Sequence, residues 1–459
     1  MWHSARRRVS RRSNPRTAPV VKKPARTRLA CQALEDRSVP SALPDSLYIG
    51  DAGINGTSSD DLVRRIDATT GADRGIFVAA NSAGLNGPRG LIFANPGVLL
   101  VVNQNVNEDF NGEVLRFNGQ TGTPLNKLVP LQDPDAPFAP RGIVMRDNTI
   151  FVADVLAADG SPGRIAIYDA DSGKFKGELV PSPTVFAEQF NPRGVVFGPD
   201  GNLYVSVFNT TNPVAGAVLR YVPATGAWSV VATNNGDGIA DPGENQSLHR
   251  PEGIVFGPDG NIYVTSYRAD ATDNDKILVL NPATGAQIDE IDTDAVGGPR
   301  AYGQGLLFGP GGGLFVPITT IGVPDSGTVR RYDVSTKTYD VFVDHGPLVQ
   351  PWYLTFGRTD PATLDYIEPA VHGSLSVTSA SGSSAAASMG VSLSTDWNTP
   401  APTDTYSIRD TNSSSADTLL PANDLASTSI GNLPVSPEIV ENVPLTWWTP
   451  DGLGLDNAS

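Results

Sequence analysis

Six short phrases in the chain carry side chains that could bind an acidic ligand. Each phrase opens an apolar run, and its second residue is polar or aromatic. The six residues at this second position are Arg89, Arg141, Arg193, Glu252, Gln304 and Trp352. Forked guanidinium groups bind carboxylate or phosphate well, so the three arginines favour an anionic ligand such as a sugar acid or a peptide carboxylate. Alternatively, they pair with Asp51, Asp154 or Glu252 and only stiffen the fold.

The phrases recur at a nearly fixed interval. They read PRGLIF, PRGIVM, PRGVVF, PEGIVF, GQGLLF and PWYLTF, and their third residues are 90, 142, 194, 253, 305 and 353. The spacings are 52, 52, 59, 52 and 48 residues. A regular period of this size predicts a solenoid or a propeller.

The residues inside one period decide between these two architectures. Each phrase is followed by a turn and a second strand, most clearly in GPDGNLYVS at 198–206 and GPDGNIYVT at 257–265. A third strand follows, such as 218–221, and then a more polar fourth strand, such as 228–231. Four antiparallel strands in each unit describe a propeller blade.

The two ends of the repeat complete each other. The last phrase, at Pro351, lacks the three strands that should follow it, whereas three orphan strands at 47–50, 62–66 and 75–78 precede the first phrase. Joining them predicts an all-β, six-bladed propeller closed by a composite blade, which leaves no open sheet edge. We expect a basic disordered leader at 1–42, the propeller at 43–368 and a Ser/Ala-rich flexible extension at 369–459.

Charge and composition exclude several classes of function. Residues 1–37 hold 11 of the 33 Lys and Arg residues and only two acids, so the rest of the chain carries a net charge of −25. A body this acidic repels nucleic acid and anionic membranes. The longest aliphatic run, Val98 to Val102, is far shorter than the roughly 20 residues of a membrane-spanning helix. The one cysteine, Cys31, allows no intrachain disulfide, and we expect a monomer.

The leader ends in a segment that suggests export. Residues 34–41 read LEDRSVPS, which resembles the LEDR-x-x-PS segment that follows a basic leader in many exported or surface proteins of planctomycete bacteria. The resemblance implies an extracellular or cell-surface location. The arginine pairs further upstream also suggest a twin-arginine signal, but no apolar stretch follows them in residues 13–40. An ordinary disordered tail is the alternative.

The repeat resembles the NHL-repeat, SMP-30/gluconolactonase-like and virginiamycin-B-lyase-like six-bladed propellers. The shared motif is complete at 192–206 and 251–265 and partial elsewhere, over about 320 residues. The resemblance implies that the residue before each blade glycine faces the mouth of a central channel, with Asp51, Asn103 and Asp154 at the ends of second strands nearby. These families include enzymes, ligand binders and scaffolds.

The resemblance also implies candidate catalytic and metal-binding residues. In the gluconolactonase-like group, Glu252 and Asp154 match two members of a set that holds a divalent metal, but the Asn-Gly member is missing. The lyase-like group uses histidine with a Glu-x-His pair, which this chain lacks. The catalytic candidates are therefore Glu252, His249 and His345, with surface-loop histidines as the alternative.

One loop resembles a calcium site. Residues 233–244 place oxygen donors at alternate positions beside glycine, as in calcium-binding loops. The candidate ligands are Asp237, Asp241 and Glu244. The alternative is an insertion rich in turns that binds no ion.

These observations favour an exported or surface-associated propeller that binds a small anionic molecule or a protein without catalysis. A metal-dependent lactonase, hydrolase or lyase and a structural scaffold of the envelope are the alternatives. Calcium is the one cofactor that the sequence suggests.

Overall fold

The computed structural model describes residues 45–368, apart from 54–59, 96, 106–110, 157–159, 210, 213, 240, 321–322 and 324–325, and also residues 405–408 and 418–421. The leader, with its predicted export segment, and most of the C-terminal extension lie outside the described residues. Within the extension, β25 (Thr405–Ile408) pairs with β26 (Thr418–Pro421). None of the helices in the described ranges has the length and apolar character needed to cross a membrane.

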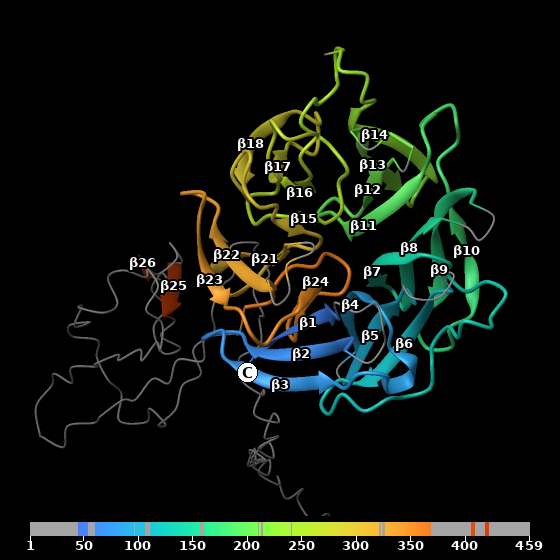
Figure 1. Cartoon of the computed structure of the whole chain (residues 1–459), viewed down its shortest axis with the longest axis vertical. Helices are drawn as coiled ribbons and strands as arrows, with labels where there is room; N and C mark the ends of the chain where they lie inside the picture. The colour runs from blue at the N-terminus through green and yellow to red at the C-terminus, as the bar shows by residue number, and fades with distance from the viewer. Residues whose placement is uncertain are drawn as a thin grey trace, which may run out of the picture. The chain divides into compact units, whose positions relative to one another are not determined.

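Six antiparallel sheets surround a common axis and form the blades of a propeller (Figure 1). Blade 1 contains β4 (Pro88–Asn95), β5 (Val98–Asn103) and β6 (Glu113–Asn118). Blade 2 contains β7 (Pro140–Arg146), β8 (Thr149–Leu156), β9 (Pro162–Asp169) and β10 (Phe175–Leu179). Blade 3 contains β11 (Asn191–Phe197), β12 (Leu203–Phe208), β13 (Gly216–Val222) and β14 (Ala227–Asn234).

The next two blades follow the same plan. Blade 4 contains β15 (Ile254–Phe256), β16 (Ile262–Ser266), β17 (Lys276–Leu280) and β18 (Gln287–Asp292). In blade 5 the inner strand is split into β19 (Tyr302–Gly303) and β20 (Leu307–Phe308), followed by β21 (Leu314–Thr319), β22 (Thr328–Asp333) and β23 (Thr338–Val343).

Blade 6 joins the two ends of the propeller. Its order is β24 (Gln350–Phe356), β1 (Ser46–Ala52), β2 (Leu62–Asp67) and β3 (Asp73–Val78). β1 pairs antiparallel with β24, with Leu47 opposite Phe356. The predicted six-bladed fold with a composite closing blade is therefore confirmed.

Glycine in the repeated phrase allows neighbouring inner strands to approach closely. A Cβ atom on Gly142 would lie 2.7 Å from the carbonyl oxygen of Arg193, and one on Gly194 would lie 2.5 Å from that of Glu252. Real Cβ atoms do not approach a backbone oxygen this closely, because their van der Waals shells overlap. Gly142 and Gly194 therefore cannot be replaced by a larger residue without a shift, and consecutive blades touch there through backbone.

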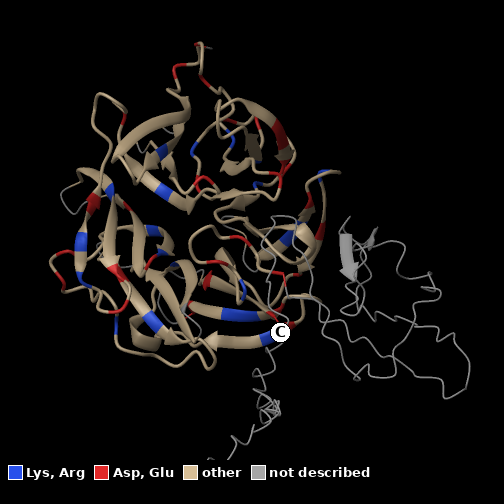
Figure 2. Ribbon diagram, turned by 180° about the vertical axis from the view of Figure 1, so that it is seen from behind, with Lys and Arg blue, Asp and Glu red and all other residues tan. Residues whose placement is uncertain are grey.

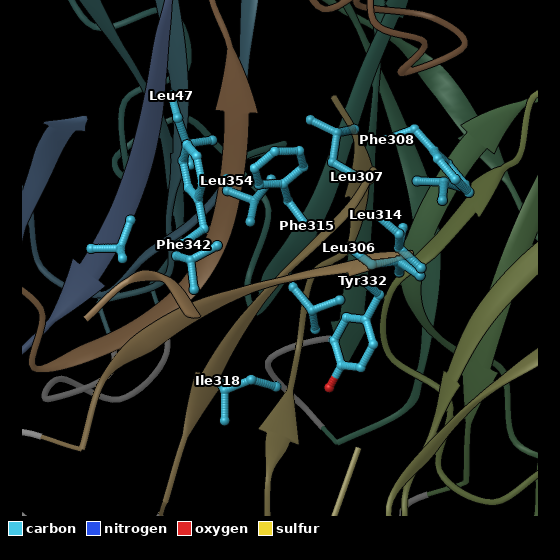
Figure 3. Close-up of a cluster of buried hydrophobic side chains, with 14 of the residues drawn as sticks. Leu47, Leu306, Leu307, Phe308, Leu314, Phe315, Ile318, Tyr332, Phe342 and Leu354 are labelled. Atoms are coloured by element: carbon cyan, nitrogen blue, oxygen red, sulfur yellow. The ribbon is translucent and has the colours of Figure 1, made fainter. Parts of the chain in front are cut away.

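Apolar side chains fill the spaces between adjacent blades. The largest cluster joins blades 4, 5 and 6, and Figure 3 shows its aromatic and aliphatic side chains packed across the ribbons. Phe315 meets Phe342 and Phe356 edge to face, with ring centroids 4.9 and 5.1 Å apart. Edge-to-face pairs of buried rings add to the stabilisation that comes from burying their area, so this seam strengthens ring closure.

The segment after the last inner strand closes one end of the axis. We call residues 357–368 the stopper. The backbone N–H groups of Met145 and Phe197, at the finishing ends of β7 and β11, donate to the carbonyl oxygens of Pro361 and Ala362 at 2.7 and 3.0 Å. Leu364 packs against four of the five apolar clusters of the propeller. One side chain thus touches core residues from nearly the whole ring.

Replacing Leu364 with alanine tests the stopper. The change removes the side chain that several blades share, and we expect the free energy of unfolding to fall by about 2–3 kcal/mol. Urea unfolding measures this loss. Leu125→Ala is the matched control, because Leu125 is 41% exposed, and its effect should stay within about 0.5 kcal/mol. Equal effects of the two substitutions would contradict the role given to Leu364.

Candidate functional site

A bulge in the inner strands sets the direction of the three arginines. In blade 1, Pro88 lies opposite Asn103 and Leu91 lies opposite Val101, so β4 carries one extra residue around Arg89 and Gly90. Blades 2 and 3 show the same shift between the proline of the phrase and the third residue after it. Because a bulge re-aims a side chain relative to the regular pleat, each arginine leaves the plane of its own blade.

The side chains from the repeated phrase meet at the ring axis. The Oε1 atom of Gln304 accepts hydrogen bonds from the Nη1 atoms of Arg89 and Arg141, both at 3.2 Å. Blades 2 and 5 lie opposite each other in the ring, so the contact between Arg141 and Gln304 crosses the axis. The guanidinium carbon of Arg89 lies 3.2 Å from the ring centroid of Trp352. We call Arg89, Arg141, Arg193, Glu252, Gln304 and Trp352 the axial cluster.

Only one axial arginine has a carboxylate partner in the described part of the chain. The Nη1 atom of Arg193 lies 3.1 Å from Oε1 of Glu252, and the two side chains are 9% and 6% exposed. Arg89 instead donates through Nε to Gln104 at 2.7 Å. Arg141 forms no ion pair with a described carboxylate. The cluster therefore holds three guanidinium groups and one carboxylate.

Burial shifts the pKa values of Arg89, Arg193 and the adjacent Tyr353, and neighbouring charges add to or oppose the effect. Burial lowers the pKa of Arg89 well below its ordinary value, and the nearby charge of Arg141 lowers it further. Burial also lowers the pKa of Arg193, an effect that Glu252 opposes and Arg141 reinforces. Burial and the charge of Glu252 raise the pKa of Tyr353 to about 12. A further negative charge would oppose the part of the shift in Arg89 and Arg193 that the charge of Arg141 causes.

Several polar atoms of this region are buried without a hydrogen-bond partner. They are the Nε atoms of Arg141 and Arg193, Oε2 of Glu252 and the hydroxyl of Tyr353. An unsatisfied buried polar atom destabilises a fold by about 1–3 kcal/mol, so such atoms require an explanation. The two Nε–H groups and the hydroxyl are donors that a carboxylate ligand would satisfy.

Asp51, Asn103 and Asp154, which lie on second strands, hold the loops that lead into the inner strands. The carboxylate of Asp154 accepts from the backbone N–H groups of Phe138 and Ala139, the latter at 2.7 Å. Asp51 accepts in the same way from Val349 and Gln350. Asn103 accepts from the N–H of Asn86 at 2.7 Å. These side chains therefore orient the phrase that carries the axial residues.

The candidate metal ligands of the channel have different partners. Asp154 faces Arg164, whose Nε atom lies 3.3 Å from Oδ2 of Asp154, whereas Glu252 faces Arg193. Across the described ranges, no group of three or more His, Cys, Asp or Glu side chains is arranged to hold a metal ion. A channel metal remains a prediction without such a group to support it.

The three candidate ligands of the calcium loop are exposed or already have hydrogen-bond partners. Asp237 is exposed and accepts from the N–H of Ile239 at 2.7 Å. Asp241 is exposed, and Glu244 accepts from the side-chain amide of Gln246 at 3.0 Å. Calcium binding at this loop also remains a prediction.

The two candidate histidines lie in different surroundings. His249 is buried, and its Nδ1 atom lies 3.4 Å from Oδ2 of Asp273. Burial lowers the pKa of His249, while Asp273 acts in the opposite direction. His345 is exposed, and its backbone N–H donates to Asp344 at 2.7 Å. Neither histidine has a hydrogen bond or ion pair to the axial cluster.

A separate concave region lies between blades 2 and 3, at the stopper end of their inner strands. Its volume is about 530 Å³, and its lining includes Phe151, Phe197, Tyr221 and Arg146. The Nη1 atom of Arg146 already donates to the carbonyl oxygen of Gly201 at 2.7 Å. Elsewhere, acidic and basic residues are intermingled around the ring (Figure 2).

Comparisons with known proteins identify structural neighbours at low similarity. No protein-family model matches the chain, and no curated protein matches it. A periplasmic gluconolactonase from Pseudomonas aeruginosa is 16% identical, with a TM-score of 0.43, covering 68% of this chain and 98% of the neighbour. A proposed 6-phosphogluconolactonase from Bacteroides fragilis is 14% identical, with a TM-score of 0.43 and coverages of 69% and 99%. Regucalcin, a calcium-binding protein from Agrobacterium tumefaciens, is 16% identical, with a TM-score of 0.36 and coverages of 58% and 74%.

Asp51 should make stability depend on pH. Burial raises its pKa to about 7, whereas an unfolded aspartate titrates near 3.9. Between these values the folded state keeps a proton that the unfolded state has released, so stability falls as pH rises through this window. Asn can accept the same backbone hydrogen bonds, as Asn103 does in blade 1. We therefore compare the free energies of unfolding of Asp51→Asn and of the native protein. The difference in favour of the variant should grow by roughly 2–4 kcal/mol between pH 4.5 and pH 8.

Urea unfolding of both proteins at the two pH values measures this difference. A difference that does not change with pH would show that burial does not control the titration of Asp51.

Proposed function

We propose that the protein is a binding module that takes the carboxylate group of a small organic acid at the axial cluster. The observation that supports it is that the single carboxylate of the cluster pairs with one of the three guanidinium groups, that of Arg193, while two buried Nε–H groups have no acceptor. A carboxylate of the ligand would accept from the Nε atoms of Arg141 and Arg193. Such charge-assisted hydrogen bonds are shorter and stronger than neutral ones.

The arrangement of the other polar groups supports this assignment over a purely structural role. Asp51 and Asp154, which could have neutralised the arginines, are used by backbone N–H groups of the loops instead. Like charges placed together in a buried site destabilise the fold, and such destabilisation is common where a site must bind a ligand. Arg141 is only partly buried, so part of its side chain is exposed to solvent although its Nε atom is buried.

Calorimetric titration of the full chain with acetate tests the proposal, with acetamide as the neutral analogue. We expect acetate to bind and acetamide not to bind. Arg141→Gln should weaken acetate binding at least tenfold, since a hydrogen bond to a charged group contributes about 1.5–3 kcal/mol. The same variant should unfold at an equal or higher temperature than the native protein, because it removes one of three like charges.

Arg331→Gln is the matched control. Arg331 lies on β22 and pairs with Asp340 at 2.9 Å, with both side chains exposed. The control loses the same charge and should bind acetate normally. Native protein that binds no acetate would overturn the proposal. So would an Arg141→Gln variant that binds acetate normally but unfolds at a clearly lower temperature, since that combination marks a structural arginine.

A further inference from the structure

A second group of arginines lies beside the axial cluster, on the side of blades 4 and 5. We call Arg250, Arg268, Arg300, Tyr267 and Tyr302 the rim cluster. Arg250 precedes Glu252 by two residues, so their Cα atoms lie at most about 7 Å apart. Tyr267 forms an edge-to-face pair with Tyr302, with ring centroids 5.5 Å apart.

Tyr267 connects the two clusters. It is buried, and its hydroxyl donates to the carbonyl oxygen of Gly303, next to Gln304, at 3.4 Å. Its pKa is raised well above the ordinary value, mainly by burial and then by the charge of Glu252, with a smaller effect from Asp275. Tyr267, a member of the rim cluster, is therefore affected by the charge of Glu252 in the axial cluster.

The carboxylates of the rim are already occupied by one arginine and by backbone. Arg300 holds Asp275 through two hydrogen bonds, from Nε at 3.0 Å and from Nη2 at 2.5 Å. Asp294 accepts from the N–H groups of Asp275 and Ala301 at 2.9 and 3.0 Å. Neither Arg250 nor Arg268 forms an ion pair with any carboxylate in the described ranges.

Arg250 combines a strained backbone with a buried donor that has no partner. Its φ angle is 43°, in the left-handed region that a non-glycine residue seldom adopts. Its Nε atom is buried and has no hydrogen-bond partner, whereas its Nη2 atom donates to the carbonyl oxygen of Arg268. Burial lowers the pKa of Arg250, and the charge of Arg300 lowers it further. Strained backbone of this kind is concentrated at functional sites.

We propose that the axial carboxylate site is one half of a two-anion site, and that the ligand is a dicarboxylic acid whose second carboxylate binds Arg250. This inference rests on the proposed function, because the axial cluster must bind the first carboxylate. Arg250 lies two residues before Glu252, the partner of Arg193, so the two anion positions belong to neighbouring parts of the fold. A ligand that reaches both clusters should bind more tightly than one that fills the axial cluster alone.

Titration with a series of linear dicarboxylates tests the proposal. Succinate, adipate, suberate and sebacate differ in span, and butyrate serves as the monocarboxylate reference. The native protein should bind one intermediate length at least tenfold more tightly than butyrate. Arg250→Gln should remove this preference for length while leaving the affinity for butyrate unchanged, and Arg331→Gln, with the same loss of charge, should behave as the native protein does.

The outcomes separate this inference from the proposed function. Butyrate binding with no preference for length, or an Arg250→Gln variant that matches Arg331→Gln, would overturn the two-anion site and leave the axial carboxylate site standing. The absence of binding by any of these acids would overturn both. Thermal unfolding of each variant confirms that the compared proteins are folded.

Discussion

The structure depends on how closely the inner strands approach one another around the axis. Glycine in the repeated phrase lets the backbone of one blade touch the backbone of the next, as at Gly142 and Gly194. The residue before that glycine sits in a bulge, so its side chain is directed out of the blade. The same geometry that closes the ring therefore brings Arg89, Arg141 and Arg193 to one end of the axis. Whatever residues the phrase carries at this position must share that small region.

The axial cluster is a basic centre within an acidic protein. The chain outside residues 1–37 has a net charge of −25, yet its axis holds three arginines and one glutamate. Placing like charges together in a poorly solvated region destabilises a fold, and neither Asp51 nor Asp154 relieves the excess. A bound carboxylate would relieve it, and the same reasoning extends to Arg250, which also lacks an acidic partner in the described ranges. At the other end of the axis, Leu364 and the stopper contribute apolar packing instead.

The repeat predicted the fold well because its period, turns and orphan strands are properties of local sequence. The pairing of β1 with β24 follows from counting the strands of each repeat, and the structure confirms it. The partners of polar side chains could not be predicted in this way. Asp154 ends a second strand whatever its role, and only the position of the loop at 138–139 makes its carboxylate an acceptor for backbone N–H groups. The stopper could not be predicted because residues 357–368 belong to no repeat, and Leu364 gains its contacts only once the ring has closed. The role of Arg250 could not be predicted either, because its positive φ angle and the missing partner of its Nε atom are properties of the folded structure alone.

The central claim is that the axial arginines keep donors for an external carboxylate. Nuclear magnetic resonance of the full chain labelled with ¹⁵Nε-arginine tests it most directly, because each buried Nε–H gives its own signal. Adding acetate should shift the Nε–H signals of Arg141 and Arg193 and leave that of Arg331 in place, with Arg141→Gln used to assign the first signal. Axial signals that do not move, or that shift no more than the signal of Arg331, would contradict the account.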